Sequence, residues 1–130
     1  MPVPERSMSV ALVHLADAVA AQSYSPYSKY AVGAVVRTTD GREFAGVNVE
    51  NAAYPLSQCA EKTALGAAAT AGYRPGDVEA IGITASPCGG CRQWLHEWRV
   101  GEVSFRRDDG SICTMKAHEL LPETWNLPDA

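Results

Sequence analysis

One stretch of the sequence combines a thiol and a carboxylate at the expected start of a helix. "SQCAEKTALGAAATAG" (57–72) has the small apolar residues of a packed helix, with Ser57 as a predicted N-cap and Gly72 as its end. Cys59 and Glu61 stand two residues apart in the predicted first turn. A helix that serves only the core needs neither group, so the pair indicates chemistry at the helix tip.

A second helix start carries two further thiols. In "SPCGGCRQWLHEW" (86–98), Ser86 is predicted to be the N-cap and Pro87 the first helical residue. Cys88 and Cys91 then lie three residues apart, on one face of the first turn. Taken alone, this spacing also fits a redox pair or a structural zinc site.

The two helix starts together predict one zinc site. Cys59, Cys88 and Cys91 would supply three thiolates, and the positive ends of both helices would lower the pKa values of those thiols. Three protein ligands leave a tetrahedral zinc ion one open position, which is typical of catalytic sites. Water in that position ionises near pH ~7. Glu61, which is not a ligand, is then positioned to accept and pass on a proton.

The remaining candidate ligands have simpler interpretations. A closed zinc site would need a fourth ligand, but His96 lies five residues beyond Cys91 and faces another direction on a helix. We interpret it, like His14 and His118, as a surface or packing residue. Cys113 lies inside a short predicted strand and is interpreted as a small core residue.

The order of expected elements predicts an α/β domain. Two strands form a hairpin with the turn signal Asp40-Gly41, and the later strands follow helices. The expected helices are 8–22, 57–71, 86–98 and a short one at 117–121, and the expected strands are 31–37, 42–48, 78–84, 102–107 and 111–116. We therefore predict a three-layer α/β/α fold with a mixed five-stranded sheet, its strand order left open.

Length and charge limit the classes of partner. The chain has 130 residues, which predicts a single domain over 1–130, and a formal net charge of −4 without a basic cluster. We expect a small-molecule substrate and neither nucleic acid nor a membrane as partner. No apolar run could span a bilayer and no export signal is recognisable, so the expected location is the cytoplasm, where thiols stay reduced.

Several motifs resemble the zinc-dependent cytidine deaminases, in particular the small homotetrameric type that acts on free nucleosides. The segments are "YSPYSKYAVGA", "GVNVENAAYPLSQCAE", "SPCGGCRQ" and "ELLPETW", which together span residues 24–125. This resemblance implies one Zn²⁺ per chain, held by Cys59, Cys88 and Cys91, and hydrolytic attack on C4 of cytosine. Glu61 would protonate ring N3 and later the departing amine, which yields uridine and ammonia.

The resemblance also assigns the substrate contacts. Asn48 and Glu50 correspond to a pair that binds the sugar 3′-hydroxyl, so a phosphate would be repelled and deoxycytidine accepted. The backbone around Ala60 would meet the polar edge of the base. Tyr54 and Trp125 would reach into the site of a neighbouring subunit.

Three features depart from the usual pattern of that family. Lys62 replaces an arginine that bonds the zinc thiolates, and offers a compact charge in place of a planar one. Tyr30, against the base, and Trp125 both stand where phenylalanine is usual. The loop between Thr84 and Pro87 is short.

These departures keep other functions open. A deaminase of a modified cytosine nucleoside, such as a blasticidin-type antibiotic, is the nearest alternative. A non-catalytic zinc module for assembly belongs to a different class. Editing of polynucleotides is opposed by the acidic charge and by Glu50.

Overall fold

A mixed sheet of five strands forms the centre of the molecule. The computed structural model describes residues 8–127. The strand order is β2-β1-β3-β4-β5; β3 and β4 run parallel, and the other neighbours run antiparallel. The strands are β1 (Gly33–Thr38), β2 (Glu43–Val47), β3 (Val78–Ile83), β4 (Glu102–Arg106) and β5 (Ile112–Lys116). The predicted mixed five-stranded sheet is confirmed.

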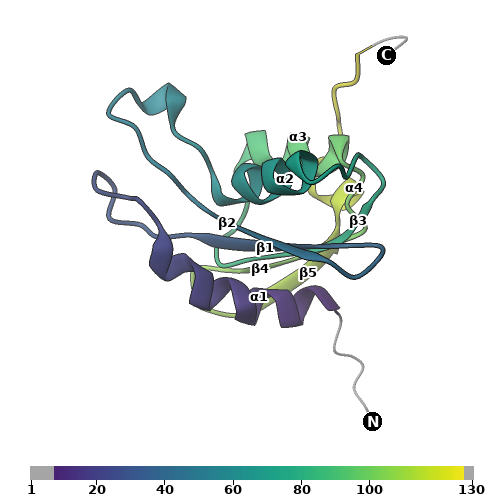
Figure 1. Ribbon diagram of the computed structural model, residues 1–130, viewed down its shortest axis with the longest axis horizontal. Coiled ribbons are helices and arrows are strands. Elements are labelled where there is room, and N and C mark those ends of the chain that lie inside the picture. Colours follow the sequence, from purple (N-terminus) through teal and green to yellow (C-terminus); the bar gives the residue numbers. More distant parts are fainter. Residues whose placement is uncertain (1–7, 128–130) are drawn as a thin grey trace.

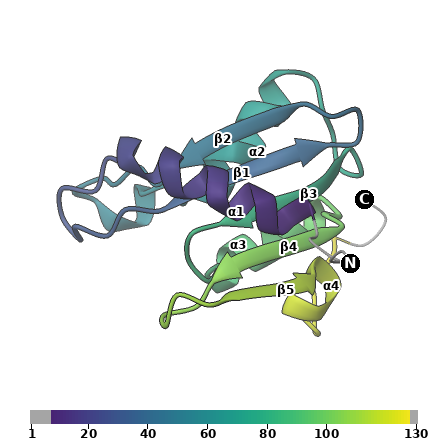
Figure 2. The ribbon, with the colours of Figure 1, turned by 90° about the horizontal axis from the view of Figure 1, so that it is seen from below.

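Helices cover both faces of this sheet. One face carries α1 (Met8–Val19), which continues into the short 3-10 helix η1 (Ala20–Gln22). The other face carries α2 (Ala60–Thr70), α3 (Gly89–Glu97) and the short α4 (Ala117–Leu120) (Figure 1). In Figure 2, where the molecule is turned by 90° and seen from below, α1 lies across the sheet. This is the predicted three-layer arrangement.

The apolar residues divide into two cores, one on each side of the sheet. The larger packs strand residues such as Ile81 and Val103 against Leu65 of α2 and Leu95 of α3, all four fully buried. The smaller lies under α1. There α1 approaches β3 so closely that a Cβ at Gly82 would lie 2.3 Å from the backbone nitrogen of Val13. Only glycine permits this contact.

The β1–β2 hairpin turns where the sequence predicts. Residues 33–37 of β1 pair with residues 43–47 of β2, and Gly41 in the turn has a φ of +94°. The side chain of Asp40 accepts hydrogen bonds from the hydroxyls of Thr38 and Tyr73. The hydrogen bond from Tyr73 thereby connects the turn to the segment that follows α2.

The predicted N-caps of α2 and α3 are wrong. The N-caps are Cys59 and Cys88, so both helices begin later than predicted. Ser57 instead ends the 3-10 helix η2 (Tyr54–Leu56), and its hydroxyl accepts a hydrogen bond from the backbone of Asn51. The hydroxyl of Ser86 accepts one from Arg92. Both hydroxyls therefore bond partners six residues away in the chain and do not cap α2 or α3.

The sheet topology brings the starts of α2 and α3 together near the carboxyl-terminal ends of β2 and β3. Because β1 is antiparallel to both of its neighbours, β2 and β3 run in the same direction and end at the same edge. The loop after each strand leads to α2 or α3. In addition, a Cβ at Gly46 would lie 2.4 Å from the backbone nitrogen of Ala64, so α2 packs directly on β2. Within residues 8–127, no helix combines the length and apolar character that a membrane crossing requires.

Candidate active site

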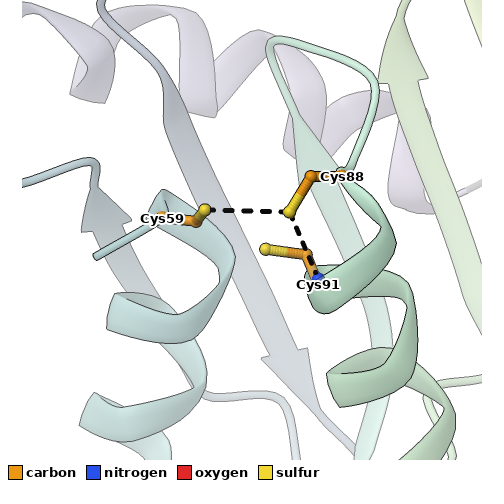
Figure 3. A group of neighbouring side chains, drawn as sticks. All are labelled: Cys59, Cys88 and Cys91. Carbon is orange, nitrogen blue, oxygen red and sulfur yellow. Dashed lines mark hydrogen bonds between the residues drawn. The ribbon is translucent and has the colours of Figure 1, made fainter. Parts of the chain in front are cut away.

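Three thiols meet where α2 and α3 begin. The sulfur atoms of Cys59, Cys88 and Cys91 all lie within 4.8 Å of one another, and the Sγ atoms of Cys59 and Cys88 are 3.9 Å apart (Figure 3). Zinc–sulfur bonds of about 2.3 Å in a tetrahedron separate two sulfur atoms by roughly 3.8 Å. The observed separation therefore fits a shared zinc ion.

The three thiols influence one another's protonation. A hydrogen bond from Cys91, followed by one from Cys88 and by the charge of Lys62, lowers the pKa of Cys59 to about 6. The pKa of Cys91 is correspondingly raised, because its thiol donates to Cys59 and is shielded from solvent. One thiolate thus keeps its neighbour protonated. Zinc binds cysteines as thiolates, so a zinc ion among the three sulfur atoms would displace the protons that remain on these thiols.

Glu61 lies beside the thiols without joining their cluster. It follows Cys59 in the first turn of α2, and its side chain is only 4 % exposed. Burial, reinforced by the charge of Cys59, raises the pKa of its carboxyl to about 7. Among the described residues, neither Glu61 nor a histidine belongs to the group of thiols that could hold a metal ion.

A cavity of about 260 Å³ opens onto Cys59, Cys88 and Glu61. It is bounded by the loop before β1, the segment after β2, the start of α2 and the loop before α3. The other lining residues are Ser28, Tyr30, Val32, Asn48, Glu50, Ala60, Ala85 and Ser86. The structure therefore brings the predicted residues Tyr30, Asn48, Glu50 and Ala60 to the same cavity as the thiols.

Asn48 and Glu50 are held by the loop that precedes β1. The side-chain amide of Asn48 donates to the carbonyl oxygen of Tyr30 at 2.8 Å, and its oxygen accepts from the backbone of Val32 at 2.9 Å. The carboxylate of Glu50 accepts hydrogen bonds from residues 27 and 28. Both side chains therefore also organise one wall of the cavity.

Ala60 and Lys62 lie on either side of Glu61 in the first turn of α2. A Cβ at Gly90 would lie 3.9 Å from Cys88 Sγ and 4.0 Å from Lys62 Nζ, which places the ammonium group next to the thiols. Ala60 is the first residue of α2 and is fully buried. Tyr30, in contrast, is 58 % exposed.

Tyr54 and Trp125 lie outside the cavity. Tyr54 is 68 % exposed in a neighbouring hollow and stacks edge-on with Tyr27, with ring centroids 6.3 Å apart. Trp125 is 66 % exposed in another hollow, and its carbonyl oxygen accepts a hydrogen bond from Gln93. Within one chain, neither aromatic ring completes the site.

The three histidines and the fourth cysteine do not belong to the cluster of three thiols. His96 Nε2 lies 2.9 Å from Oδ1 of Asn126, and His14 lies 4.0 Å from the carboxylate of Asp17 on α1. His118 is exposed on α4. Cys113 is partly buried and packs against the larger core.

Residues 7–107 match the family model described as the cytidine and deoxycytidylate deaminase zinc-binding region. The chain belongs to this deaminase family. Among curated members, it is 39 % identical over 115 residues to a cytidine deaminase of Halalkalibacterium halodurans, covering 82 % of this chain and 86 % of that protein. It is 38 % identical over 118 residues to one from Mycobacterium tuberculosis, covering 88 % and 86 % respectively.

Solved structures of cytidine deaminases share the fold. The crystal structure of the Burkholderia pseudomallei enzyme has a TM-score of 0.84 at 41 % identity, covering 92 % of this chain and all of that one. The structure from Mycobacterium leprae has a TM-score of 0.74 at 36 % identity, covering 91 % and 100 %. The predicted deaminase fold is thus confirmed.

Sequence reasoning missed four residues of the cavity wall, namely Ser28, Val32, Ala85 and Ser86. Ser28 is the most consequential, because its hydroxyl contacts Glu50. It lies in the segment "SYSPYSKY", where small polar residues are typical of any turn. No feature of that segment distinguishes Ser28 from its neighbouring serines.

Proposed function

We propose that this protein is a zinc-dependent deaminase that hydrolyses cytidine and deoxycytidine to uridine and deoxyuridine with release of ammonia. The observation that carries this conclusion is the junction of three thiols with a buried carboxylate, facing a cavity with an asparagine–glutamate pair. Membership of the deaminase family supports the same reaction.

Cys59, Cys88 and Cys91 would hold the zinc ion. When bound, zinc lowers the pKa of water so that it becomes a nucleophile at neutral pH. Glu61, which lines the cavity, would accept the proton released from that water. The same carboxyl would pass this first proton to ring N3. It would then take the remaining proton from the hydroxyl group added at C4 and deliver it to the departing amine, which leaves as ammonia. Lys62 would offset part of the negative charge of the three thiolates.

The part of the cavity that is lined by Asn48, Glu50 and Tyr30 would bind the nucleoside. Glu50 and Asn48 would bond the 3′-hydroxyl of the sugar, and the negative charge of Glu50 would disfavour a phosphate. This contact does not involve the 2′ position of the sugar, so ribose and deoxyribose would both be accepted. The backbone at Ala60 would meet the polar edge of the base, and Tyr30 would pack against it.

The working enzyme would be a homotetramer in the cytoplasm. Tyr54 and Trp125 are both exposed in the single chain, although aromatic side chains of this size favour burial. We assign them to the sites of neighbouring subunits. Each cavity would then be complete only after assembly, within pyrimidine salvage.

The alternatives have less support. The curated relatives reported above are cytidine deaminases, which does not favour a deaminase of modified nucleosides or a zinc module without catalysis. The cavity itself offers a route for a small molecule to the thiols, and a structural zinc site would not require one.

Ultraviolet spectroscopy of cytidine with the zinc-loaded protein tests the function. We expect conversion of cytidine and deoxycytidine to their uracil counterparts, with one ammonia released per turnover, and much slower conversion of cytidine monophosphate. A blasticidin-type nucleoside serves as the competing substrate. Cytidine turnover at the background rate, in protein with one zinc per chain, would contradict the proposal.

A further inference from the structure

The carboxylate of Glu50 is surrounded by hydrogen-bond donors from one loop. Its Oε1 atom accepts from the backbone N–H of Tyr27 at 2.9 Å and from that of Ser28 at 3.1 Å. Its Oε2 atom accepts from the hydroxyl of Ser28. An ionised carboxylate has about four acceptor sites, so three donors leave one site for a further partner.

The remaining acceptor site belongs to Oε2. Oε1 already accepts two hydrogen bonds, whereas Oε2 accepts only the one from Ser28. Glu50 and Ser28 both line the cavity that opens onto Cys59, Cys88 and Glu61. The Ser28 hydroxyl therefore contacts the same oxygen that is left to bind a ligand.

The loop conformation fixes the direction of the Ser28 hydroxyl. Its oxygen accepts the backbone N–H of Tyr30 at 3.0 Å, and its only hydrogen is donated to Glu50. Lys29, between them, has a φ of +61°, and its N–H donates to the carbonyl oxygen of Ser25 at 3.1 Å. The turn thus presents Ser28 to Glu50 in one orientation.

The contact also keeps Glu50 in its charged form. The hydrogen bond from Ser28 is the main cause that lowers the pKa of the Glu50 carboxyl, and the nearby charge of Lys29 acts in the same direction. A carboxylate is a stronger acceptor for a hydroxyl than a carboxylic acid is. Ser28 thereby favours both the geometry and the ionisation that sugar binding requires.

We propose that Ser28 is a positioning residue for sugar recognition, and that it orients Glu50 so that Oε2 receives the 3′-hydroxyl of the nucleoside. This inference rests on the proposed function, since it assigns a determinant of specificity within the same site. Ser28 acts through Glu50 and touches none of the reacting atoms.

The test compares cytidine with 2′,3′-dideoxycytidine, which lacks the 3′-hydroxyl. Ser28→Ala should raise the KM for cytidine about tenfold, the loss expected for one hydrogen bond to a charged group, with kcat within twofold. The KM for 2′,3′-dideoxycytidine should stay within twofold of wild type. Ser111→Ala, at an exposed serine before β5 whose hydroxyl donates to Asp109, is the control and should change neither KM.

Two further variants separate positioning from loss of structure. Ser28→Thr keeps the hydroxyl and should restore most of the affinity for cytidine. In a Glu50→Gln background, Ser28→Ala should add no further increase in KM, because its effect passes through the carboxylate. Zinc content and the thermal midpoint are measured for every variant.

Three results would overturn the inference. They are an unchanged KM for cytidine in Ser28→Ala, an equal rise in KM for both substrates, and full additivity with Glu50→Gln. An equal rise would assign the effect to Tyr30 and the base instead of the sugar. Absence of cytidine turnover in the wild-type protein would refute the proposed function itself, so the two failures are distinguishable.

Discussion

Glu61 and Cys59 lie in the same helical turn, yet their surroundings assign them opposite tasks. Hydrogen bonds from neighbouring thiols favour the thiolate of Cys59, and burial favours the protonated carboxyl of Glu61. One group is thereby prepared to bind a cation and the other to hold a proton. This division explains why a helix tip needs both residue types two positions apart.

Glu61→Gln should separate the two tasks. The amide has nearly the shape of the carboxyl group but cannot transfer the proton, so kcat should fall by a factor of about 10² to 10⁴. The zinc-to-chain ratio, measured by elemental analysis, should equal that of the wild type. Glu43→Gln, an exposed carboxylate on β2, is the control and should leave kcat unchanged. A kcat within threefold of wild type in Glu61→Gln would remove this residue from the mechanism.

At the scale of elements, the position of α2 depends on contact with β2. Gly46 allows the backbone of the helix to approach the strand directly, and this contact holds the N-terminus of α2 at the sheet edge where the thiols meet. A side chain at Gly46 would overlap the backbone of Ala60 and Ala64, and would therefore push the start of α2 away from β2.

Two glycine substitutions test this dependence. Gly46→Ala should destabilise the fold by about 1–3 kcal/mol, because the added methyl group would overlap backbone atoms, and should lower zinc binding. Gly66→Ala is the control inside α2, where no atom lies within 4 Å of the added Cβ. It should stabilise the fold by about 0.5–1 kcal/mol through helix propensity. Denaturant unfolding measures both, and equal stability of the two variants would contradict the packing argument.

The sequence predicts elements better than it predicts contacts between them. The hairpin, the mixed sheet and the helices on both faces follow from apolar patterns and local turn signals. The N-caps at Ser57 and Ser86 were wrong because their hydroxyls bond Asn51 and Arg92 instead. The contact from Ser28 to Glu50 joins residues 22 positions apart. No local pattern encodes such a contact.

The zinc site was easier to anticipate than the cavity wall. Thiol spacing within each helix start is a local feature, and the three cysteines do converge. The roles of Asn48, Glu50 and Tyr30 came from resemblance alone. The structure places these residues in the cavity, and their functions remain predictions, of which the Glu50→Gln background above tests that of Glu50.

At the scale of the whole molecule, stability in acid should depend on Asp40. Hydrogen bonds from Thr38 and then Tyr73 lower the pKa of its carboxyl below the usual 3.8. A lowered pKa stabilises the folded state above pH 3.8, and this contribution is lost as the pH falls through the folded-state pKa.

Asp40→Asn should therefore be less stable than wild type at pH 7, and the difference should shrink as the pH falls below about 4. Thermal midpoints measured across this pH range check the prediction. Asp108→Asn, in the turn between β4 and β5, serves as a control for the removed charge. A stability difference that stays constant with pH would contradict the role of Asp40.

The proposed sharing of cavities between subunits can also be tested. In the proposed homotetramer, with Trp125 completing a neighbouring site, Trp125→Ala would weaken every cavity of its own assembly and Glu61→Gln would inactivate every cavity of its own. Mixed tetramers would contain cavities with Glu61 from one chain and Trp125 from the other. Refolding the two variants together should give more activity than the average of the two parent variants, whereas activity equal to that average would refute shared sites.

In the proposed enzyme, three thiolates hold one zinc ion and leave one coordination position open to solvent. X-ray absorption spectroscopy of the zinc-loaded protein measures this most directly. We predict three sulfur atoms at about 2.3 Å and one lighter ligand atom at about 2.0 Å. A shell of four sulfur atoms, a histidine ligand in the fourth position, or fewer than three sulfur atoms would contradict the account.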